Sequence, residues 1–454
     1  MKYKGRVLLV ASVASMIDQF NLSNIRLLQD MGYQVHVACN FAEGNTCGGM
    51  RLQKLQKRLR QMHVAQYQWD CPRSLYPPGR CMAAYRQLLA LLSRKEYTWL
   101  HCHSPIGGAL ARIAAHSKGI RVVYTAHGFH FYRGAPLLNW LLYYPVEKLL
   151  SYWTDMLITV NKEDCHFAQR NLRAQKIVYI PGVGVDPVYF AAKKALLKDG
   201  AKREFRRKYR IPEQAFVLLS VGELSRRKNH RMVLSALAEL ARPDVYYVVC
   251  GQGAYGDALR SYAEKKGISG RLRLVGYQEY LNQWYRNADI FVFPSKQEGM
   301  PVALMEAMAA GLPCVVSDIR GSRELIAERP DGGRGLSAWR AVKDAGGIRV
   351  PVNDPKSFAQ ALQVLLQSGS LRYACGERNR EKIKHYALPV VEERMRRIYT
   401  DFSRSRNRTQ ARWNASKTGK KTQEWERRIK NDQGIACTQI KQICRSGKCG
   451  NYDM

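Results

Sequence analysis

One stretch of the chain, residues 291–326, constrains the fold more than any other part of the sequence. It begins with the apolar segment FVF, continues through the loop SKQEGM and the segment VALMEAMAA, and ends with the apolar segment CVVSD. Pro301 stands where a first helical turn would begin, because that position tolerates a missing N–H group. Gly311 follows the last helical position, where glycine commonly ends a helix. The stretch therefore predicts a buried strand, a loop, a helix and a second buried strand in close succession.

Two carboxylates have unusual positions within this stretch. Glu306 is the one charged residue of an otherwise apolar predicted helix, and a buried carboxylate needs a partner. Glu298 lies in the loop before the helix, where free N–H groups and the helix dipole favour an anion such as a phosphate. The spacing leaves two interpretations open. Glu306 could pair with an arginine in the core while Glu298 faces solvent, or both carboxylates could belong to a ligand site.

The segment EGMPVALMEAMAAGLPCVVSDIRG resembles the nucleotide-sugar-binding signature of the retaining glycosyltransferases of family 4. This resemblance implies the α/β fold called GT-B, in which two Rossmann-like domains face a central cleft and a C-terminal helix returns to the first domain. It implies that Glu298 faces the transferred sugar, while the N–H groups of Gly299 and Met300, in the same loop as Pro301, bind the diphosphate. Glu306 would accept hydrogen bonds from both ribose hydroxyls, which suits the two oxygens of a carboxylate.

Histidines follow two apolar strands in the first part of the chain. His101 and His103 alternate to the same face at the end of the strand YTWLHCH, and His127 and His130 follow the strand RVVYTA. An H-x-H pair can bind a metal, but no third ligand stands at a recognisable spacing, so we expect no metal site. A structural role remains open for each of these histidines.

The segment TAHGFHFYRGAPLLNWLLYYPVEKLL is similar to the N-terminal domain of bacterial family 4 enzymes that build capsule, exopolysaccharide and related lipid-linked glycans. By this resemblance His127 is the cleft histidine and acts in catalysis together with Glu298, across the cleft. His103 and His130 would lie on the acceptor side or in the cleft. The resemblance also makes a nucleoside diphosphate sugar, with UDP as the nucleotide, the expected donor, and a lipid-linked saccharide the expected acceptor.

A basic loop follows the predicted strand FVLLSVGEL. Family 4 enzymes usually carry G-R-x-x-x-x-K at this point, and Lys228 matches the lysine expected to bind phosphate. Glu223 stands where the family has arginine, so the second cation of the phosphate clamp must come from elsewhere. Arg226 or Arg227 could supply it with bidentate geometry. The alternative to a phosphate-binding site is an ordinary basic surface loop before a helix.

A literal G-x-G-x-x-G motif occurs in GQGAYG, directly after the apolar segment VYYVVC. With Glu279 after the next strand, it would suit a dinucleotide, so an NAD-dependent oxidoreductase is the alternative function. Against this, the motif follows the second strand of its domain. By the family resemblance Gly251 and Gly253 line the donor site, and Gly276 and Tyr277 lie near the base.

The formal net charge of the chain is +36, which suits nucleic acid, anionic lipid or phosphorylated substrates as partners. A nucleic-acid-binding protein is therefore a third hypothesis, although we expect no specific nucleic acid. The predicted helix over residues 51–62 has one apolar face and is otherwise basic, which fits either a solvated surface or an anionic membrane surface. The longest apolar stretch is broken by charges before it reaches spanning length, so we expect no membrane crossing. With the basic charge and the lipid-linked acceptor that the resemblance implies, we expect a cytoplasmic protein, peripheral on the inner face of the cell membrane.

We expect neither a cofactor nor a metal. The chain contains no D-x-D sequence, which argues for charge neutralisation by Lys228, nearby arginines and helix N–H groups. The predicted domains are an acceptor-side Rossmann-like domain over residues 1–180 and a nucleotide-sugar-binding domain over residues 181–372. A helix over residues 373–402 would cross back to the first domain, and the basic tail over residues 403–454 is predicted to be disordered.

Overall fold

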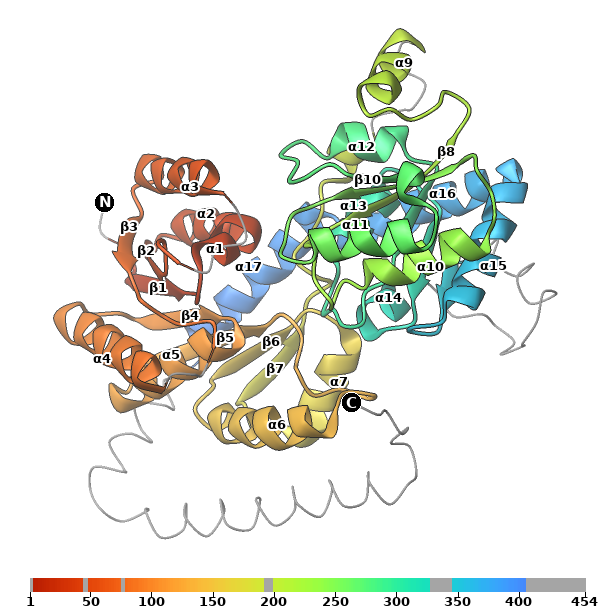
Figure 1. The fold of residues 1–454 in the computed structure, drawn as a ribbon. Coiled ribbons are helices and arrows are strands. Elements are labelled where there is room, and N and C mark those ends of the chain that lie inside the picture. Colours follow the sequence, from red (N-terminus) through yellow and green to blue (C-terminus); the bar gives the residue numbers. More distant parts are fainter. Residues whose placement is uncertain (1–2, 44–47, 75–77, 192–198, 327–344, 406–454) are drawn as a thin grey trace. The chain divides into compact units, whose positions relative to one another are not determined.

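The computed structural model describes residues 3–43, 48–74, 78–191, 199–326 and 345–405. These residues divide into two compact units (Figure 1). The first unit contains the chain up to Ile180 and the last described helix from Glu392 onward. The second unit runs from Pro181 to Val391.

The first unit is built on a seven-stranded parallel sheet with the strand order β3-β2-β1-β4-β5-β6-β7. Its strands are β1 (Arg6–Val10), β2 (Gln34–Cys39), β3 (Ala65–Gln68), β4 (Trp99–His103), β5 (Arg121–Ala126), β6 (Met156–Thr159) and β7 (Lys176–Tyr179). Its helices are α1 (Ala14–Phe20), α2 (Leu22–Asp30), α3 (Gly49–Gln61), α4 (Pro78–Arg94), α5 (Pro105–Ser117), α6 (Leu137–Ser151), α7 (Lys162–Asn171) and most of α17 (Leu388–Arg404). In Figure 1, α1 to α3 cover one face of the sheet, and α4, α5 and α6 cover the other. Both faces are therefore covered, which is why every residue of the central strands β4 and β5 is buried.

The second unit is built on a six-stranded parallel sheet with the strand order β10-β9-β8-β11-β12-β13. Its strands are β8 (Phe216–Val221), β9 (Val245–Cys250), β10 (Leu272–Leu274), β11 (Ile290–Phe293), β12 (Cys314–Ser317) and β13 (Gly347–Val350). Its helices are α8 (Pro187–Phe190), α9 (Asp199–Lys208), α10 (His230–Glu239), α11 (Gly256–Lys265), α12 (Asn282–Asn287), α13 (Val302–Ala309), α14 (Arg320–Leu325), α15 (Pro355–Gln367) and α16 (Gly369–Ile383). The strand order reverses between β8 and β11, and open parallel sheets bind ligands at the carboxyl ends of such strands.

The structure confirms the strand–helix–strand unit predicted from residues 291–326. It consists of β11, α13 and β12, and β11 pairs in parallel with both β8 and β12. Pro301 caps α13, and Gly311 follows the helix with φ +73°, a conformation that a side chain would strain. Leu304, Met305 and Met308 on α13 are fully buried in the core of the second unit. The burial of α13 and of the strands on either side of it therefore stabilises the β11–α13–β12 segment.

The structure corrects the predicted C-terminal helix. In place of one helix over residues 373–402 there are two, α16 and α17, separated by a short 3-10 turn at Lys384–Tyr386. Pro389 stands at the start of α17, and a proline there cannot continue a helix from the preceding turn, because it lacks an N–H group and clashes with the turn before it. The second unit thus extends to Val391. Helix α17 ends at Arg404, two positions into the predicted tail, and residues 406–454 lie outside the described residues.

Helix α3 confirms the predicted amphipathic helix near residues 51–62. Leu55 and Leu59 are buried, while Lys54, Lys57 and Arg58 are exposed. In the part of the chain that the structure describes, no helix combines the length and apolar character needed to cross a lipid bilayer.

Candidate functional site

Two loops converge at the point where the strand order of the second unit reverses. The first follows β8 and contains residues 222–229, and the second follows β11 and contains residues 294–301. The N–H group of Lys296 donates to the carbonyl of Arg227 at 2.9 Å, and Asn229 Nδ2 donates to the carbonyl of Pro294 at 3.2 Å. Because these contacts join the two loops through the backbone, the side chains that they carry are held close together.

Three charged side chains meet between these loops. Lys228 Nζ lies 2.8 Å from Glu298 Oε1, and Arg227 Nη1 donates to the same oxygen at 2.7 Å. Burial raises the pKa of Glu298, but the charges of Lys228 and Arg227 outweigh burial and hold that pKa below its ordinary value. Glu298 is therefore a carboxylate at neutral pH, with two cations beside it.

The two arginines that could replace the family arginine have different surroundings. Arg227 contacts Glu298 and also donates to the carbonyl of Gln297 at 2.9 Å. Arg226 is exposed and has no side-chain partner among the residues that the structure describes, and Glu223 is exposed as well. The geometry therefore brings Arg227, and not Arg226, to Lys228 and Glu298.

The loop between Glu298 and α13 lies against α14. Arg320, which is buried, donates from Nε to the carbonyl of Glu298 at 3.0 Å. A side chain at Gly321 would come within 2.6 Å of the carbonyl oxygen of Gly299, so the two segments can only approach this closely at a glycine. The N–H groups of Gly299 and Met300 have no acceptor among the described residues. They are thus available to an anion at the N-terminus of α13.

The glycine-rich segment after β9 packs against the loop after β8. A side chain at Gly251 would come within 1.7 Å of the carbonyl oxygen of Gly222, and one at Gly253 within 2.4 Å of the carbonyl oxygen of Leu224. Gly251 also donates its N–H to the carbonyl of Gly276 at 2.8 Å, while Tyr277 is exposed. These glycines allow the loops to pack closely beside Lys228, and this explains the G-x-G-x-x-G sequence without a dinucleotide.

Glu306 on α13 is half-buried. Among the described residues its hydrogen-bond partner is the hydroxyl of Tyr285 on α12, at 2.8 Å from Oε2, and no cation pairs with it. Burial raises the pKa of Glu306 to about 7, an effect that the hydrogen bond from Tyr285 only partly opposes. The described residues therefore do not form the ion pair with a core arginine that the sequence left open. Instead, one carboxylate oxygen, Oε1, remains without a donor from the described residues.

A second group of candidates lies at the carboxyl ends of β4 and β5 in the first unit. His103 Nδ1 and His127 Nε2 are 3.1 Å apart and share a hydrogen bond. Burial lowers the pKa of His127 to about 4 and also lowers the pKa of His103, so both rings are neutral at pH 7. His130 lies apart from this pair, with its ring against Tyr143 and its carbonyl accepting from Asn139 Nδ2 at 3.0 Å. Of the predicted histidines, the structure thus brings His103 and His127 together.

His101 is held in the core of the first unit. Its Nδ1 lies 2.8 Å from the Tyr399 hydroxyl on α17, and its Nε2 lies 2.8 Å from Thr125 Oγ1. Burial lowers its pKa to about 3. Within the described ranges, no group of three or more His, Cys, Asp or Glu side chains is arranged to hold a metal ion.

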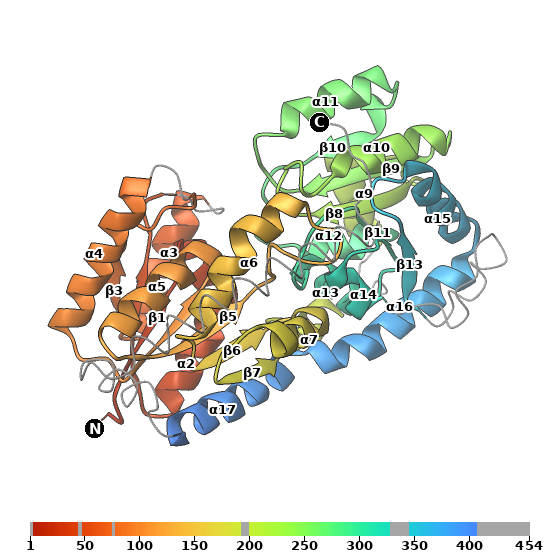
Figure 2. The same ribbon diagram turned by 90° about the horizontal axis from the view of Figure 1, so that it is seen from below.

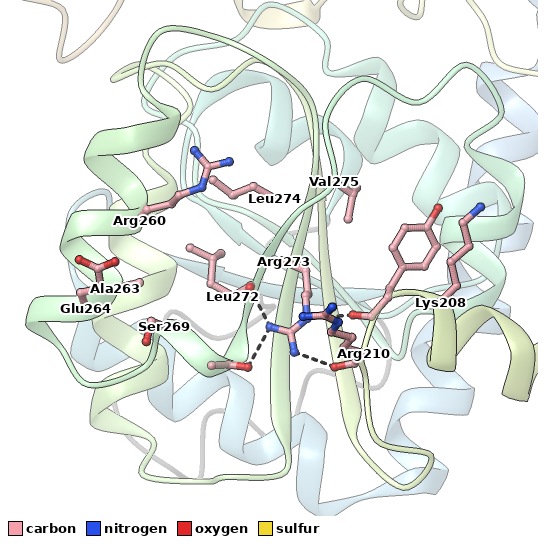
Figure 3. Close-up of a pocket in the computed structure, with 12 residues that line it drawn as sticks. Lys208, Arg210, Arg260, Ala263, Glu264, Ser269, Leu272, Arg273, Leu274 and Val275 are labelled. Carbon is pink, nitrogen blue, oxygen red and sulfur yellow. Dashed lines mark hydrogen bonds between the residues drawn. The ribbon is translucent and has the colours of Figure 1, made fainter.

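A hollow of about 660 Å³ lies at the edge of the second sheet, beside β10, α11 and the end of α9 (Figure 3). Its floor is formed by Arg273, which donates to the carbonyls of Tyr209 and Arg210 at 2.9 and 2.6 Å. None of the predicted site residues line it. Arg273 is held by backbone carbonyls and Arg260 by Asp257, so the hollow is a weaker candidate than the two loops.

Two residues of the site were missed by the sequence analysis. Tyr285, the partner of Glu306, lies on a short helix whose sequence looks like ordinary core packing. Arg320 lies near the end of the segment that carries the family resemblance, and its contact with the backbone of Glu298 depends on how α14 packs. Neither residue has a spacing relative to its partner that a sequence motif could reveal.

Comparisons with known proteins agree with this arrangement. A family model described as Glycosyltransferase Family 4 matches residues 21–188, and one described as Glycosyl transferases group 1 matches residues 201–382. The chain is 32% identical over 407 residues to the putative glycosyltransferase EpsD of Bacillus subtilis, covering 87% of this chain and 97% of that protein. It is also 32% identical over 315 residues to the Escherichia coli UDP-Gal:alpha-D-GlcNAc-diphosphoundecaprenol alpha-1,3-galactosyltransferase, covering 66% of this chain and 76% of that protein.

Solved structures show the same fold. HepE from Anabaena, determined in complex with UDP and glucose, superposes with a TM-score of 0.68 at 15% identity, covering 87% of this chain and 99% of that one. WaaG, a glycosyltransferase involved in lipopolysaccharide biosynthesis, superposes with a TM-score of 0.62 at 19% identity, covering 87% and 98% of the two chains. The predicted GT-B class, with two parallel-sheet Rossmann-like domains, is therefore confirmed.

Proposed function

This chain belongs to glycosyltransferase family 4, and we propose that it transfers a sugar from UDP to a saccharide carried on a lipid, in the synthesis of capsule, exopolysaccharide or a related surface glycan. In this reaction the acceptor hydroxyl oxygen bonds to the anomeric carbon, while the bond from that carbon to the diphosphate breaks. The acceptor proton is taken up by the departing diphosphate. Transfer with retention of the anomeric configuration belongs to the same proposal.

The observation that carries the proposal is the cluster of Lys228, Arg227 and Glu298 at the strand reversal of the second sheet. A sugar diphosphate presents negative charge on one side and a polar ring on the other. Lys228 and Arg227 can neutralise the diphosphate, assisted by the N–H groups that precede α13. Because these groups are themselves cationic or polarised, we propose that the leaving diphosphate is stabilised without a metal ion or a cofactor.

Two further observations support the choice of donor and acceptor. Glu306 has a carboxylate oxygen without a donor among the described residues, as a ligand bound through two adjacent ribose hydroxyls would require. HepE was determined with UDP bound, and the E. coli relative is named for a UDP-linked donor and an acceptor on undecaprenol diphosphate. A lipid-linked acceptor would place the enzyme at the cytoplasmic face of a membrane, and the net charge of +36 would favour an anionic one.

The test of this function is a comparison of wild type with Lys228→Ala in titrations with UDP, uridine and NADH. Wild type is expected to bind UDP, and NADH is expected not to compete. Lys228→Ala should lose about 1.5–3 kcal/mol of UDP binding, the range for hydrogen bonds to a charged group, while uridine affinity stays the same. A screen of UDP- and GDP-sugars for transfer would then identify the donor.

The two arginines of the same loop are the matched controls for this test. Arg227→Ala should weaken UDP binding in the same direction as Lys228→Ala, because Arg227 lies beside Glu298, whereas Arg226→Ala should have no effect. The proposal fails if Lys228→Ala weakens uridine as much as UDP, or if NADH binds in preference to UDP.

A second expected result concerns pH and Glu306. In the free protein the pKa of Glu306 is about 7, whereas ribose hydroxyls bind best to the charged carboxylate. The site must therefore release a proton to bind, so affinity for UDP-glucose should rise roughly tenfold from about pH 6 to about pH 8. UDP-glucose is the right probe, because it has no terminal phosphate that titrates in this range.

Glu306→Gln isolates this effect. The variant should bind UDP-glucose about 1.5–3 kcal/mol more weakly at pH 8, and its affinity should no longer change with pH. A wild-type affinity that is flat over the same range would show that Glu306 is not the ribose ligand. Thermal unfolding of the variant checks that the exchange leaves the fold intact.

A further inference from the structure

Helix α6 carries a continuous row of exposed apolar side chains on its outer face. The row consists of Leu137 (43% exposed), Leu138 (62%), Leu141 (50%), Leu142 (54%) and Val146 (51%). Residues at these spacings lie on one side of a helix, over about two and a half turns. Single exposed apolar residues are ordinary on protein surfaces, but a row of this kind marks a surface that another body covers.

The inner face of α6 is fixed, so the outer residues cannot turn inward. Arg112 on α5 is fully buried and forms a bidentate pair with Glu147, at 2.6 and 3.0 Å. The guanidinium of Arg112 also lies 4.0 Å above the ring of Tyr124 on β5. Tyr144 and Leu150 are buried on the same side of α6. The helix is therefore anchored to the sheet with its row of leucines facing outward. The ribbon of α6 lies below β6 and β7 in Figure 1, on the side that faces the viewer in Figure 2.

The exposed charged side chains of the segment that contains α6 are all positive. Between residues 105 and 173, Lys118, Arg133, Lys162, Arg170 and Arg173 are exposed. The carboxylates of the same segment are three buried ones, Glu147, Asp155 and Asp164, and the half-buried Glu163. Helix α7, which carries Lys162 and Arg170, packs beside α6, since the rings of Trp140 and Phe167 are in contact. An apolar strip bordered by positive charge is complementary to an anionic lipid surface.

The size of the strip argues against a second copy of the chain as its occupant. A helix of 15 residues is about 22 Å long, so one face of α6 offers roughly 200 Å². A stable dimer buries about 800 Å² on each partner. Two chains that each carry a net charge of +36 would also repel one another.

We propose that the outer face of α6 inserts into the headgroup region of an anionic membrane and holds the first unit at the lipid surface. The position of α6 relative to His127 links this membrane contact to the binding of the acceptor. Residues 127–136 connect β5 to α6, and the hydrogen bond from Asn139 Nδ2 to the carbonyl of His130 ties this connection to the helix. The saccharide of a lipid-linked acceptor would then lie near the strand ends that carry His127. This last step rests on the proposed function, whereas membrane insertion does not.

The test is flotation of the full-length protein with vesicles of phosphatidylglycerol and phosphatidylcholine, compared with phosphatidylcholine alone. Wild type should float with the anionic vesicles and keep part of its binding at about 1 M salt, where charge attraction is screened. The triple variant Leu138→Gln/Leu141→Gln/Leu142→Gln should bind at least about tenfold more weakly, because the burial of three leucines is lost. Its remaining binding should vanish at high salt.

The matched control is the triple variant Met82→Gln/Val188→Gln/Tyr373→Gln, which removes exposed apolar side chains elsewhere and should float like wild type. The inference is overturned if the α6 variant floats like wild type, or if salt alone releases wild type completely. It is also overturned if wild type is a dimer that the α6 variant dissociates, since a second copy would then cover the strip. UDP titration of the same proteins separates this result from the proposed function: a wild type that floats without binding UDP refutes the function and leaves the membrane contact standing.

Discussion

Glu298→Gln is expected to lower the turnover of sugar transfer by about 10²–10³ while UDP affinity is not reduced, because the loss of one group aimed at developing charge commonly costs that much in rate. The structure gives a reason why UDP affinity should not fall. Lys228 and Arg227 both contact Glu298 Oε1, so a diphosphate must share these cations with the carboxylate. Removal of the negative charge frees both cations for the diphosphate. Steady-state kinetics with the preferred UDP-sugar, together with UDP titration, measure the two effects separately.

Glu223→Gln is the control for this variant, because Glu223 is an exposed carboxylate in the loop after β8 and forms no ion pair with Lys228 or Arg227 among the described residues. It should leave both turnover and UDP affinity unchanged. If Glu298→Gln instead weakened UDP binding and kept a normal turnover, Glu298 would serve only to position the two cations. The burial of Glu298 beside Lys228 and Arg227 would then be a structural ion pair, and not the solvent-facing carboxylate that the sequence left open.

Much of the fold could be predicted from the sequence because its signals are local. Pro301 and Gly311 bracket α13, the apolar runs of β11 and β12 lack polar alternation, and each signal depends on a few neighbouring residues. The break between α16 and α17 has a physical cause. Residues on both sides of Pro389 favour a helix, but a proline at that point must start a new helix.

Much less of the site could be predicted, because its contacts join residues far apart in the chain. From the sequence, Arg226 and Arg227 are equally good candidates for the second cation of the phosphate clamp. Only the packing of two loops brings Arg227 to Glu298. In the same way, the pairing of Glu306 with Tyr285 depends on how α12 packs against α13. A motif identifies which residue types are present in a loop, but the direction of each side chain is set by tertiary packing.

In the histidine pair of the first unit, burial determines which ring nitrogens carry a proton. His103 Nε2 is buried and has no hydrogen-bond partner among the described residues. A buried ring nitrogen without a proton costs less free energy than a buried N–H group without an acceptor. His103 therefore carries its proton on Nδ1, and this N–H group donates a hydrogen bond to His127 Nε2. His127 then carries its own proton on Nδ1. It can therefore offer a hydrogen bond to a sugar hydroxyl, but with a pKa of about 4 it does not deliver a proton at pH 7.

His127→Ala should accordingly lower turnover by about 10²–10³ with UDP affinity nearly unchanged, as expected for a group that acts on the sugar alone. His127→Gln should retain more activity, because a neutral N–H donor is what the site requires. At saturating donor, wild-type turnover should show no titration of a histidine between about pH 6 and pH 8, since His127 is neutral throughout.

We propose that His103 positions His127 through their hydrogen bond, so His103→Leu should reduce turnover roughly tenfold, the value of one hydrogen bond, without changing the pH profile. His130→Ala is the control, because His130 packs against Tyr143 and not against His127, and it should leave turnover within about twofold of wild type. Loss of transfer in His130→Ala with normal transfer in His127→Ala would reverse the assignment of the two histidines. A turnover that followed protonation near pH 6.5 would instead mean that His127 works as a proton donor, which its burial beside His103 argues against.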